Sequence, residues 1–140
     1  MVMQHPIIAK DPGKAKVKPN LADYDATRAS FKWEDIEKEL DWLPNGGLNL
    51  AHEAIDRHCL HGNGGKNAMI WEGKNGEEET YSYDDLRRMT NKFSNVLETL
   101  GVKKGQRVFT FMERLPEIYF TVFGTLKAGC IIGPLFSAFG

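Results

Sequence analysis

The fold of this chain is decided by residues 105–136, which read Gly105-Gln-Arg-Val-Phe-Thr-Phe-Met-Glu-Arg-Leu-Pro-Glu-Ile-Tyr-Phe-Thr-Val-Phe-Gly-Thr-Leu-Lys-Ala-Gly-Cys-Ile-Ile-Gly-Pro-Leu-Phe136. Residues 107–112 form an apolar, β-branched and aromatic run of strand length. Residues 130–135 form a second apolar run without polar alternation, which is typical of a strand covered on both faces. Pro116 suits the first turn of a helix between these runs, and Gly129 suits the left-handed cap after its end.

The helix between the two runs carries apolar residues at helical spacing, namely Ile118, Val122 and Leu126, with Tyr119 and Phe123 beside them. Two strands joined by a helix lie parallel through a right-handed crossover. The pattern therefore predicts a parallel βαβ unit and an α/β fold class.

Composition and charge limit the partners of the chain. Its 140 residues have the size of one ordinary domain and are enough to bury a core. With 18 Lys and Arg against 19 Asp and Glu, the net charge of −1 does not favour a nucleic-acid partner. Cys59 and Cys130 are far apart in the sequence, which indicates reduced thiols in a cytosolic protein. No segment reaches the roughly 20 apolar residues of a membrane helix, so we expect a cytoplasmic protein without a membrane partner.

Three segments follow one another along the chain. Residues 1–20 contain prolines and alternating lysines with few large apolar residues, which predicts a mobile basic arm. Residues 21–61 form an N-terminal helical segment whose aromatic residues are expected to anchor the arm, and residues 62–140 carry the α/β unit. The helical face of the middle segment consists of Trp33, Ile36 and Leu40.

A short helix is predicted from Asn49 to His58, because the Asn49 side chain is able to accept a backbone N–H at the helix start. His58, Cys59 and His61, with His52 upstream, are residue types that bind zinc. Their spacing matches none of the usual zinc motifs, so His58 is better interpreted as a cation at the negative end of the helix dipole. The predicted apolar face of this helix consists of Leu50, Ala51, Ala54 and Ile55.

Residues 61–66, His-Gly-Asn-Gly-Gly-Lys, resemble a phosphate-binding loop only superficially. A P-loop follows a strand and has Ser or Thr after its Lys at the start of a helix, whereas asparagine follows here. We therefore interpret this loop as a flexible connector. Residues 67–72 and 77–81 then predict a β-hairpin, with Asn75-Gly76 as a two-residue turn.

A long helix is predicted after the hairpin. Ser82 and Asp85 have the spacing of a capping box, in which each side chain bonds the backbone N–H of the other residue, and Gly101 is the expected stop. Packed on the parallel strands, this helix completes a layered α/β arrangement. Its apolar stripe consists of Leu86, Met89, Phe93, Val96, Leu97 and Leu100, and its polar face of Arg87, Arg88, Asn91, Lys92 and Glu98.

Two motifs are specific enough to suggest a family, namely Ala54-Ile-Asp-Arg-His58 and Gly133-Pro-Leu-Phe-Ser-Ala-Phe139. With residues 31–33, 80–82, 105–112 and 114–120, they resemble the N-terminal part of the AMP-forming acetyl-CoA synthetases, within the acyl-adenylate-forming enzyme family. The resemblance runs from about residue 24 to the end of the chain. Two small departures are Gln106, where an acidic residue is common, and Glu113, where proline is common.

The resemblance implies a layered αβα N-terminal domain of which residues 62–140 are the first part, so we expect an incomplete domain. Enzymes of that family use ATP and Mg²⁺ to convert a carboxylic acid into an acyl-adenylate, and then transfer the acyl group to CoA. Acetate or another short acid is the implied substrate. The phosphate loop, the adenine-binding and aspartate motifs and the C-terminal domain would lie beyond Gly140. The remainder of the polypeptide is therefore the implied partner, and the chain alone is expected to be an inactive fragment.

One segment is a candidate for contact with CoA. Family members have a Phe-Gly-Gly-Phe-like segment near the path of CoA, where this chain has Phe136, Ser137, Ala138 and Phe139. Ligands of open α/β sheets do sit beyond the carboxyl ends of strands, although replacement of the two glycines makes close backbone approach less favourable. The alternative is that both phenylalanines belong to the core. No residue is assigned catalysis or metal binding, including the polar residues after the first strand, which are Glu113, Arg114 and Glu117.

Two other functions fit the sequence. A stand-alone binding or interaction module would explain the domain-like length. A ligase for longer or branched acids would differ only in a pocket that this chain does not include. The open edge left by the second strand favours the fragment of a ligase, because complete domains normally cover such edges.

Overall fold

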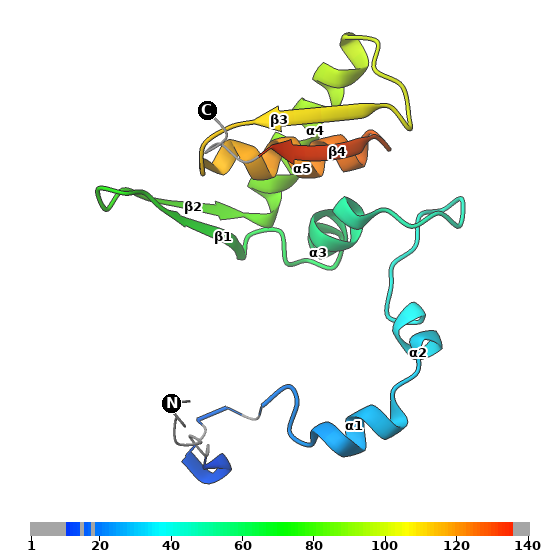
Figure 1. Ribbon diagram of the computed structural model, residues 1–140, viewed down its shortest axis with the longest axis vertical. Helices are drawn as coiled ribbons and strands as arrows, with labels where there is room; N and C mark the ends of the chain where they lie inside the picture. The colour runs from blue at the N-terminus through cyan, green and yellow to red at the C-terminus, as the bar shows by residue number, and fades with distance from the viewer. Residues whose placement is uncertain (1–10, 15, 18, 136–140) are drawn as a thin grey trace, which may run out of the picture. The chain divides into compact units, whose positions relative to one another are not determined.

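The structure is a computed structural model that describes residues 11–14, 16–17 and 19–135 (Figure 1). The chain divides into two compact units, Met1–Glu39 and Leu40–Gly140.

The first unit contains η1 (Pro12–Lys14), α1 (Tyr24–Ser30) and α2 (Trp33–Glu37). Asp23 caps α1 by accepting the Ala26 N–H at 2.9 Å. The predicted helical face is only partly formed, because α2 ends at Glu37, before Leu40, and no residue of α1 or α2 is buried. Helices this short depend on tertiary packing for their stability.

The second unit consists of a hairpin, a parallel pair of strands and the helices beside them. β3 and β4 pair in parallel from Arg107↔Ile131 to Phe111↔Leu135, which confirms the predicted βαβ unit. α5 packs against both strands and α4 packs against α5 (Figure 1). In chain order the elements are η2 (His52–Asp56), α3 (Arg57–Leu60), β1 (Asn67–Glu72), β2 (Glu78–Ser82), α4 (Tyr83–Thr99), β3 (Arg107–Phe111), α5 (Pro116–Lys127) and β4 (Ile131–Leu135).

The helix that begins after Asn49 is confirmed, and part of it is π-helical. Asn49 Oδ1 accepts the N–H of Ala51 at 2.9 Å, which is the predicted cap. Ala51 and Ile55 are buried as expected, but Leu50 is 63% exposed, so its placement on the apolar face is wrong. Leu50 precedes the π-helical turn η2, and none of the described elements covers its side chain at this position.

The predicted two-residue turn of the hairpin is also wrong. Gly73 N–H donates to Glu77 O at 2.7 Å, and Gly76 N–H donates to Gly73 O at 3.1 Å. Residues 74–76 thus form a three-residue loop, a type I turn followed by a left-handed residue, with Gly76 at a φ of 87°. Only the glycine adopts a positive φ here, whereas a two-residue type I′ turn needs it at two positions.

The apolar stripe of α4 is only partly correct. Leu86 and Leu97 are buried, whereas Val96 is exposed and Leu100 is 72% exposed. Thr90, which the stripe omits, is fully buried, and its hydroxyl donates to Leu86 O at 2.7 Å. The reason is the close approach of α5, where a Cβ added at Gly124 would lie 2.8 Å from Thr90 O.

The sheet of β3 and β4 has one open face within the described residues. Phe109, Phe111, Ile131 and Leu135 are exposed, whereas Thr110 on the opposite face is buried. The expectation that β4 is covered on both faces is therefore wrong for the described part of the chain. α5 covers one face, and an apolar strand sequence does not say which element covers the other.

The predicted capping box at the start of α4 is confirmed and makes stability depend on pH. Ser82 Oγ accepts the Asp85 N–H at 3.1 Å, and Asp85 Oδ2 accepts the Ser82 N–H at 3.0 Å. The hydrogen bonds of Ser82, followed by Arg88, hold the pKa of Asp85 below its ordinary value of 3.8. A lowered folded-state pKa contributes stability above the ordinary pKa, and this contribution is lost as the pH falls through the lowered value.

Replacing the capping hydroxyl tests this reading. Ser82→Ala is expected to lower the free energy of unfolding at neutral pH by about 1 kcal/mol, because an N-cap bond is lost. The variant is also expected to lose less stability than the unmodified chain below about pH 4, where the Asp85 carboxylate becomes protonated. Urea denaturation at several pH values measures both effects. Ser94→Ala, the same change in the interior of α4, is the control and should show neither.

Candidate functional site

The carboxyl ends of β3 and β4 form the edge at which a ligand is expected. The two strands are parallel and Phe111 is paired with Leu135, so both strands end at the same edge of the sheet. Ligands of open α/β sheets bind beyond this edge. The segment 112–115, which leaves β3 and leads into α5, is the described part of this edge.

The predicted CoA-contacting residues, Phe136, Ser137, Ala138 and Phe139, lie outside the described residues. They follow directly on Leu135, the last residue of β4. Their role, and the alternative that the phenylalanines belong to the core, stay predictions.

A hydrogen bond from the β1–β2 hairpin holds the loop that follows β3. Trp71 Nε1 of β1 donates to Arg114 O at 2.8 Å. Leu115 N–H donates to Glu113 O at 2.8 Å, and Pro116 begins α5 as predicted. Both Glu113 and Arg114 have exposed side chains. The link to Trp71 has no sequence signal, because 43 positions separate the two residues.

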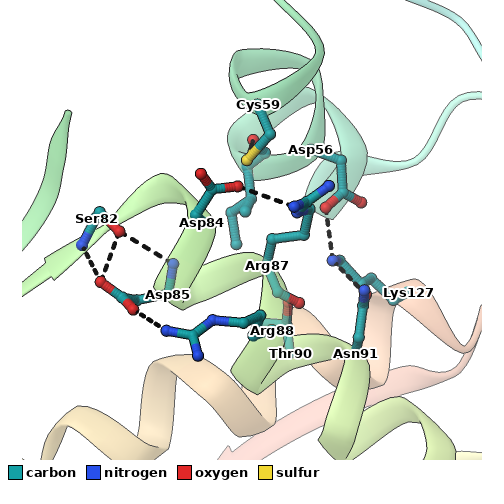
Figure 2. A network of polar contacts seen from close by, with 11 residues as sticks. Asp56, Cys59, Ser82, Asp84, Asp85, Arg87, Arg88, Thr90, Asn91 and Lys127 are labelled. Carbon is teal, nitrogen blue, oxygen red and sulfur yellow. Dashed lines mark hydrogen bonds and ion pairs between the residues drawn. The ribbon is translucent and has the colours of Figure 1, made fainter. Parts of the chain in front are cut away.

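A polar network joins the opposite end of α5 to its neighbours (Figure 2). Lys127 Nζ donates to Asp56 Oδ1 at 2.6 Å and to Asn91 Oδ1 at 2.7 Å, which connects α5 with η2 and α4. The Lys127 side chain is 9% exposed and that of Asp56 is 24% exposed. An ammonium group this buried is held by its carboxylate partner, so the arrangement is suited to fixing the three helices together.

The glycine-containing loop before the hairpin packs on the start of α4. Gly64 O accepts the Asp84 N–H at 2.9 Å, and a Cβ at Gly64 would lie 2.3 Å from Asp84 Oδ2. Arg87 Nη2 lies 2.9 Å from Asp84 Oδ1 (Figure 2). Gly64 thus packs closely against the start of α4, where a side chain would displace the Asp84 carboxylate.

The candidate zinc ligands of the sequence point to different partners. The rings of His58 and Tyr83 lie 4.4 Å apart, and His61 Nε2 lies 3.0 Å from Asp41 Oδ2. Burial, followed by the neighbouring Asp84 carboxylate, raises the pKa of Cys59, which disfavours the thiolate that binds metals. Within the described ranges, no three His, Cys, Asp or Glu side chains gather as a metal ion would require. None of the helices described is both long and apolar enough to cross a bilayer.

The chain is similar to AMP-binding enzymes and to coenzyme A synthetases. The sequence profile described as "AMP-binding enzyme" matches residues 56–140. Acetyl-coenzyme A synthetase of Bacillus subtilis (strain 168) is 42% identical over 121 residues, which cover 86% of this chain and 21% of that protein. The 3-hydroxypropionyl-coenzyme A synthetase of Sulfurisphaera tokodaii is 37% identical over 99 residues, which cover 71% of this chain and 15% of that protein.

A solved structure gives the same result. The crystal structure of an acyl-CoA synthetase from Brucella canis superposes with a TM-score of 0.71 at 29% identity, covering 84% of this chain and 21% of that one. The chain thus spans between 15% and 21% of the length of these relatives. Because the matching profile covers more than half of the chain, and the incomplete α/β fold agrees with it, the chain belongs to the AMP-binding enzyme family.

Proposed function

We propose that this chain is the N-terminal part of an AMP-forming acyl-CoA ligase. The intact enzyme would use ATP and Mg²⁺ to convert acetate, or another short carboxylic acid, into an acyl-adenylate, and would then transfer the acyl group to CoA. The observation that carries the proposal is the 42% identity with an acetyl-coenzyme A synthetase over 86% of the chain. A cytoplasmic location accords with this function.

The described residues would act as scaffold in this enzyme. The loop of residues 61–66 lacks the Ser or Thr that follows the Lys of a phosphate-binding loop. We therefore assign no step of the reaction to a described side chain. Residues 136–139 are the proposed CoA contact, residues 62–140 the first part of the catalytic N-terminal domain, residues 21–61 a helical segment and residues 1–20 an arm.

Pyrophosphate exchange tests this function. The product of the full reading frame is expected to exchange labelled pyrophosphate into ATP when acetate is present, because acyl-adenylate formation is reversible. The 140-residue chain is expected to show no exchange, since the family resemblance places the phosphate loop and the adenine-binding motif beyond Gly140. Exchange by the 140-residue chain would contradict the scaffold role, and no exchange with any carboxylic acid in the longer product would contradict the ligase.

A second acid follows from the relatives. Because one of them is named as a 3-hydroxypropionyl-coenzyme A synthetase, 3-hydroxypropionate is the first alternative to acetate, and longer or branched acids come next. The value of kcat/KM for each acid, measured in the same exchange assay, ranks these acids. The acid with the highest value is identified as the substrate.

A further inference from the structure

Asparagine is followed directly by glycine at residues 45–46, 63–64 and 75–76. In such a pair the backbone nitrogen of the glycine is able to attack the side-chain carbonyl carbon of the asparagine, because glycine has no Cβ to hinder the approach. We propose that Asn45 is a site of spontaneous deamidation, and that the fold protects the other two asparagines. This chemistry belongs to the folded chain itself and does not depend on the ligase function.

The reaction consumes water and releases ammonia. The Gly46 nitrogen gives its proton to hydroxide and bonds to Asn45 Cγ, so that Oδ1 becomes an oxyanion. The Cγ–Nδ2 bond then breaks, and the nitrogen takes up a proton from water and leaves as ammonia. The five-membered succinimide ring that remains is opened by water at either carbonyl carbon. The product is an aspartate, or an isoaspartate in which the main chain runs through the former side chain.

The surroundings of Asn45 favour this reaction. Asn45 and Gly46 are exposed, and a Cβ at Gly46 would meet nothing within 4 Å, so the loop has room for the ring. Asn45 Oδ1 accepts the Gly47 N–H at 3.0 Å. This oxygen gains negative charge in the intermediate, and an N–H donor already placed there stabilises that charge. One bond opposes the attack, since the Gly46 N–H donates to Leu43 O at 2.8 Å and has to open first.

The electrostatic surroundings of Asn75 are the opposite. The Gly76 N–H also donates to a backbone oxygen, that of Gly73 at 3.1 Å, so this bond does not distinguish the two pairs. The side chain does, because Asn75 Nδ2 donates to Glu77 Oε1 at 2.9 Å and Asn75 N–H donates to Glu77 Oε2 at 3.0 Å. These bonds hold the pKa of Glu77 below its ordinary value of 4.5, so the carboxylate is charged at neutral pH. A negative charge beside the amide opposes both the anionic nucleophile and the oxyanion.

Packing restrains the third asparagine, Asn63. Its N–H donates to His58 O at 2.8 Å, and its carbonyl oxygen accepts the Lys66 N–H at 2.9 Å, so the residue is bonded on both sides. Gly64 is buried, and the Asp84 carboxylate lies where a side chain of Gly64 would be. Ring closure requires the Gly64 nitrogen to turn toward the Asn63 side chain, which this packing resists. The Asp84 charge also opposes the anionic nucleophile.

The test measures the rate at each asparagine in the product of the full reading frame. The protein is incubated in mildly alkaline buffer and digested at mildly acidic pH, and peptide mapping by mass spectrometry gives the converted fraction at each site. Asn45 is expected to convert about three- to tenfold faster than Asn75 and Asn63, which is the effect of one hydrogen bond of ordinary strength. In concentrated urea the three rates are expected to converge, because each asparagine then has only its local sequence. An equal or higher rate at Asn75 or Asn63 in the folded protein would overturn the proposal.

Two variants separate the causes. Glu77→Gln keeps an amide oxygen as acceptor and removes the charge, so the rate at Asn75 is expected to rise about threefold while that at Asn45 stays the same. An unchanged rate at Asn75 would overturn the protection by Glu77. Asn45→Gln lengthens the side chain by one carbon, so attack would have to form a six-membered ring, and conversion of that peptide is expected to stop. Continued conversion would place the modification on Asn49 and overturn the assignment to Asn45.

Discussion

Gly124→Val is expected to lower the free energy of unfolding of the 140-residue chain by about 3 kcal/mol, because side-chain atoms are forced into a packed helix crossing. A Cβ at Gly124 would lie 2.8 Å from Thr90 O and 2.9 Å from the Cβ of Phe93. The first of these atoms is backbone, so α4 or α5 would have to shift as a whole. The small gain in helix propensity on replacing glycine, less than about 1 kcal/mol, does not offset this overlap. Urea denaturation followed by circular dichroism measures the effect.

The matched control for this variant is Gly65→Ala. Gly65 is exposed and a Cβ there would meet nothing within 4 Å, so the change is expected to stay within about 0.5 kcal/mol of the unmodified chain. Equal stability of Gly124→Val and Gly65→Ala would show that α4 and α5 do not cross as closely as the structure has them.

Lys127→Met is expected to lower the free energy of unfolding by about 2 kcal/mol, because it leaves a partly buried carboxylate without its cation. The ammonium group bonds Asp56 and Asn91, and its side chain is 9% exposed. Since Asp56 is 24% exposed, water compensates part of the loss, and the effect is smaller than for a fully buried pair. Methionine keeps most of the aliphatic volume, so the change isolates the charge.

A surface pair and a double variant control for this result. Lys38→Met removes a cation that pairs with Asp35 at 2.8 Å in an exposed site, and it should cost less than about 0.5 kcal/mol. Adding Asp56→Asn to Lys127→Met is expected to recover about 1 kcal/mol, because no uncompensated charge is left. A double variant no more stable than Lys127→Met would contradict the ion pair as the source of the effect.

Local signals in the sequence predict much of the second unit. The cap at Asn49, the capping box of Ser82 and Asp85, and the start of α5 at Pro116 are all confirmed. Each of these depends on residues within one helical turn. The parallel pairing of β3 and β4 is confirmed because the crossover rule needs only the order of strand and helix.

The wrong predictions share a cause. The exposure of Leu50, the exposure of Leu100 and the open face of β4 all depend on which elements of the fold lie against these residues. The dipeptide Asn75-Gly76 predicts a two-residue turn, whereas the hydrogen-bonded pair Gly73 and Glu77 sets the loop length at three residues. Burial and register arise from contacts between elements, which periodicity within one element does not specify.

The sequence by itself determined the α/β class, the order and ends of most elements and the resemblance to the AMP-binding family, because these follow from neighbouring residues and from motifs. For the candidate site it pointed to residues 136–139, which stay a prediction, and it contained no sign of Trp71. Only the tertiary structure decided that Trp71 holds Arg114 and that Lys127 holds Asp56, across 43 and 71 positions of the chain. Such contacts require the parallel strands and their helices to be in place, since only the folded chain brings the partners within hydrogen-bonding distance.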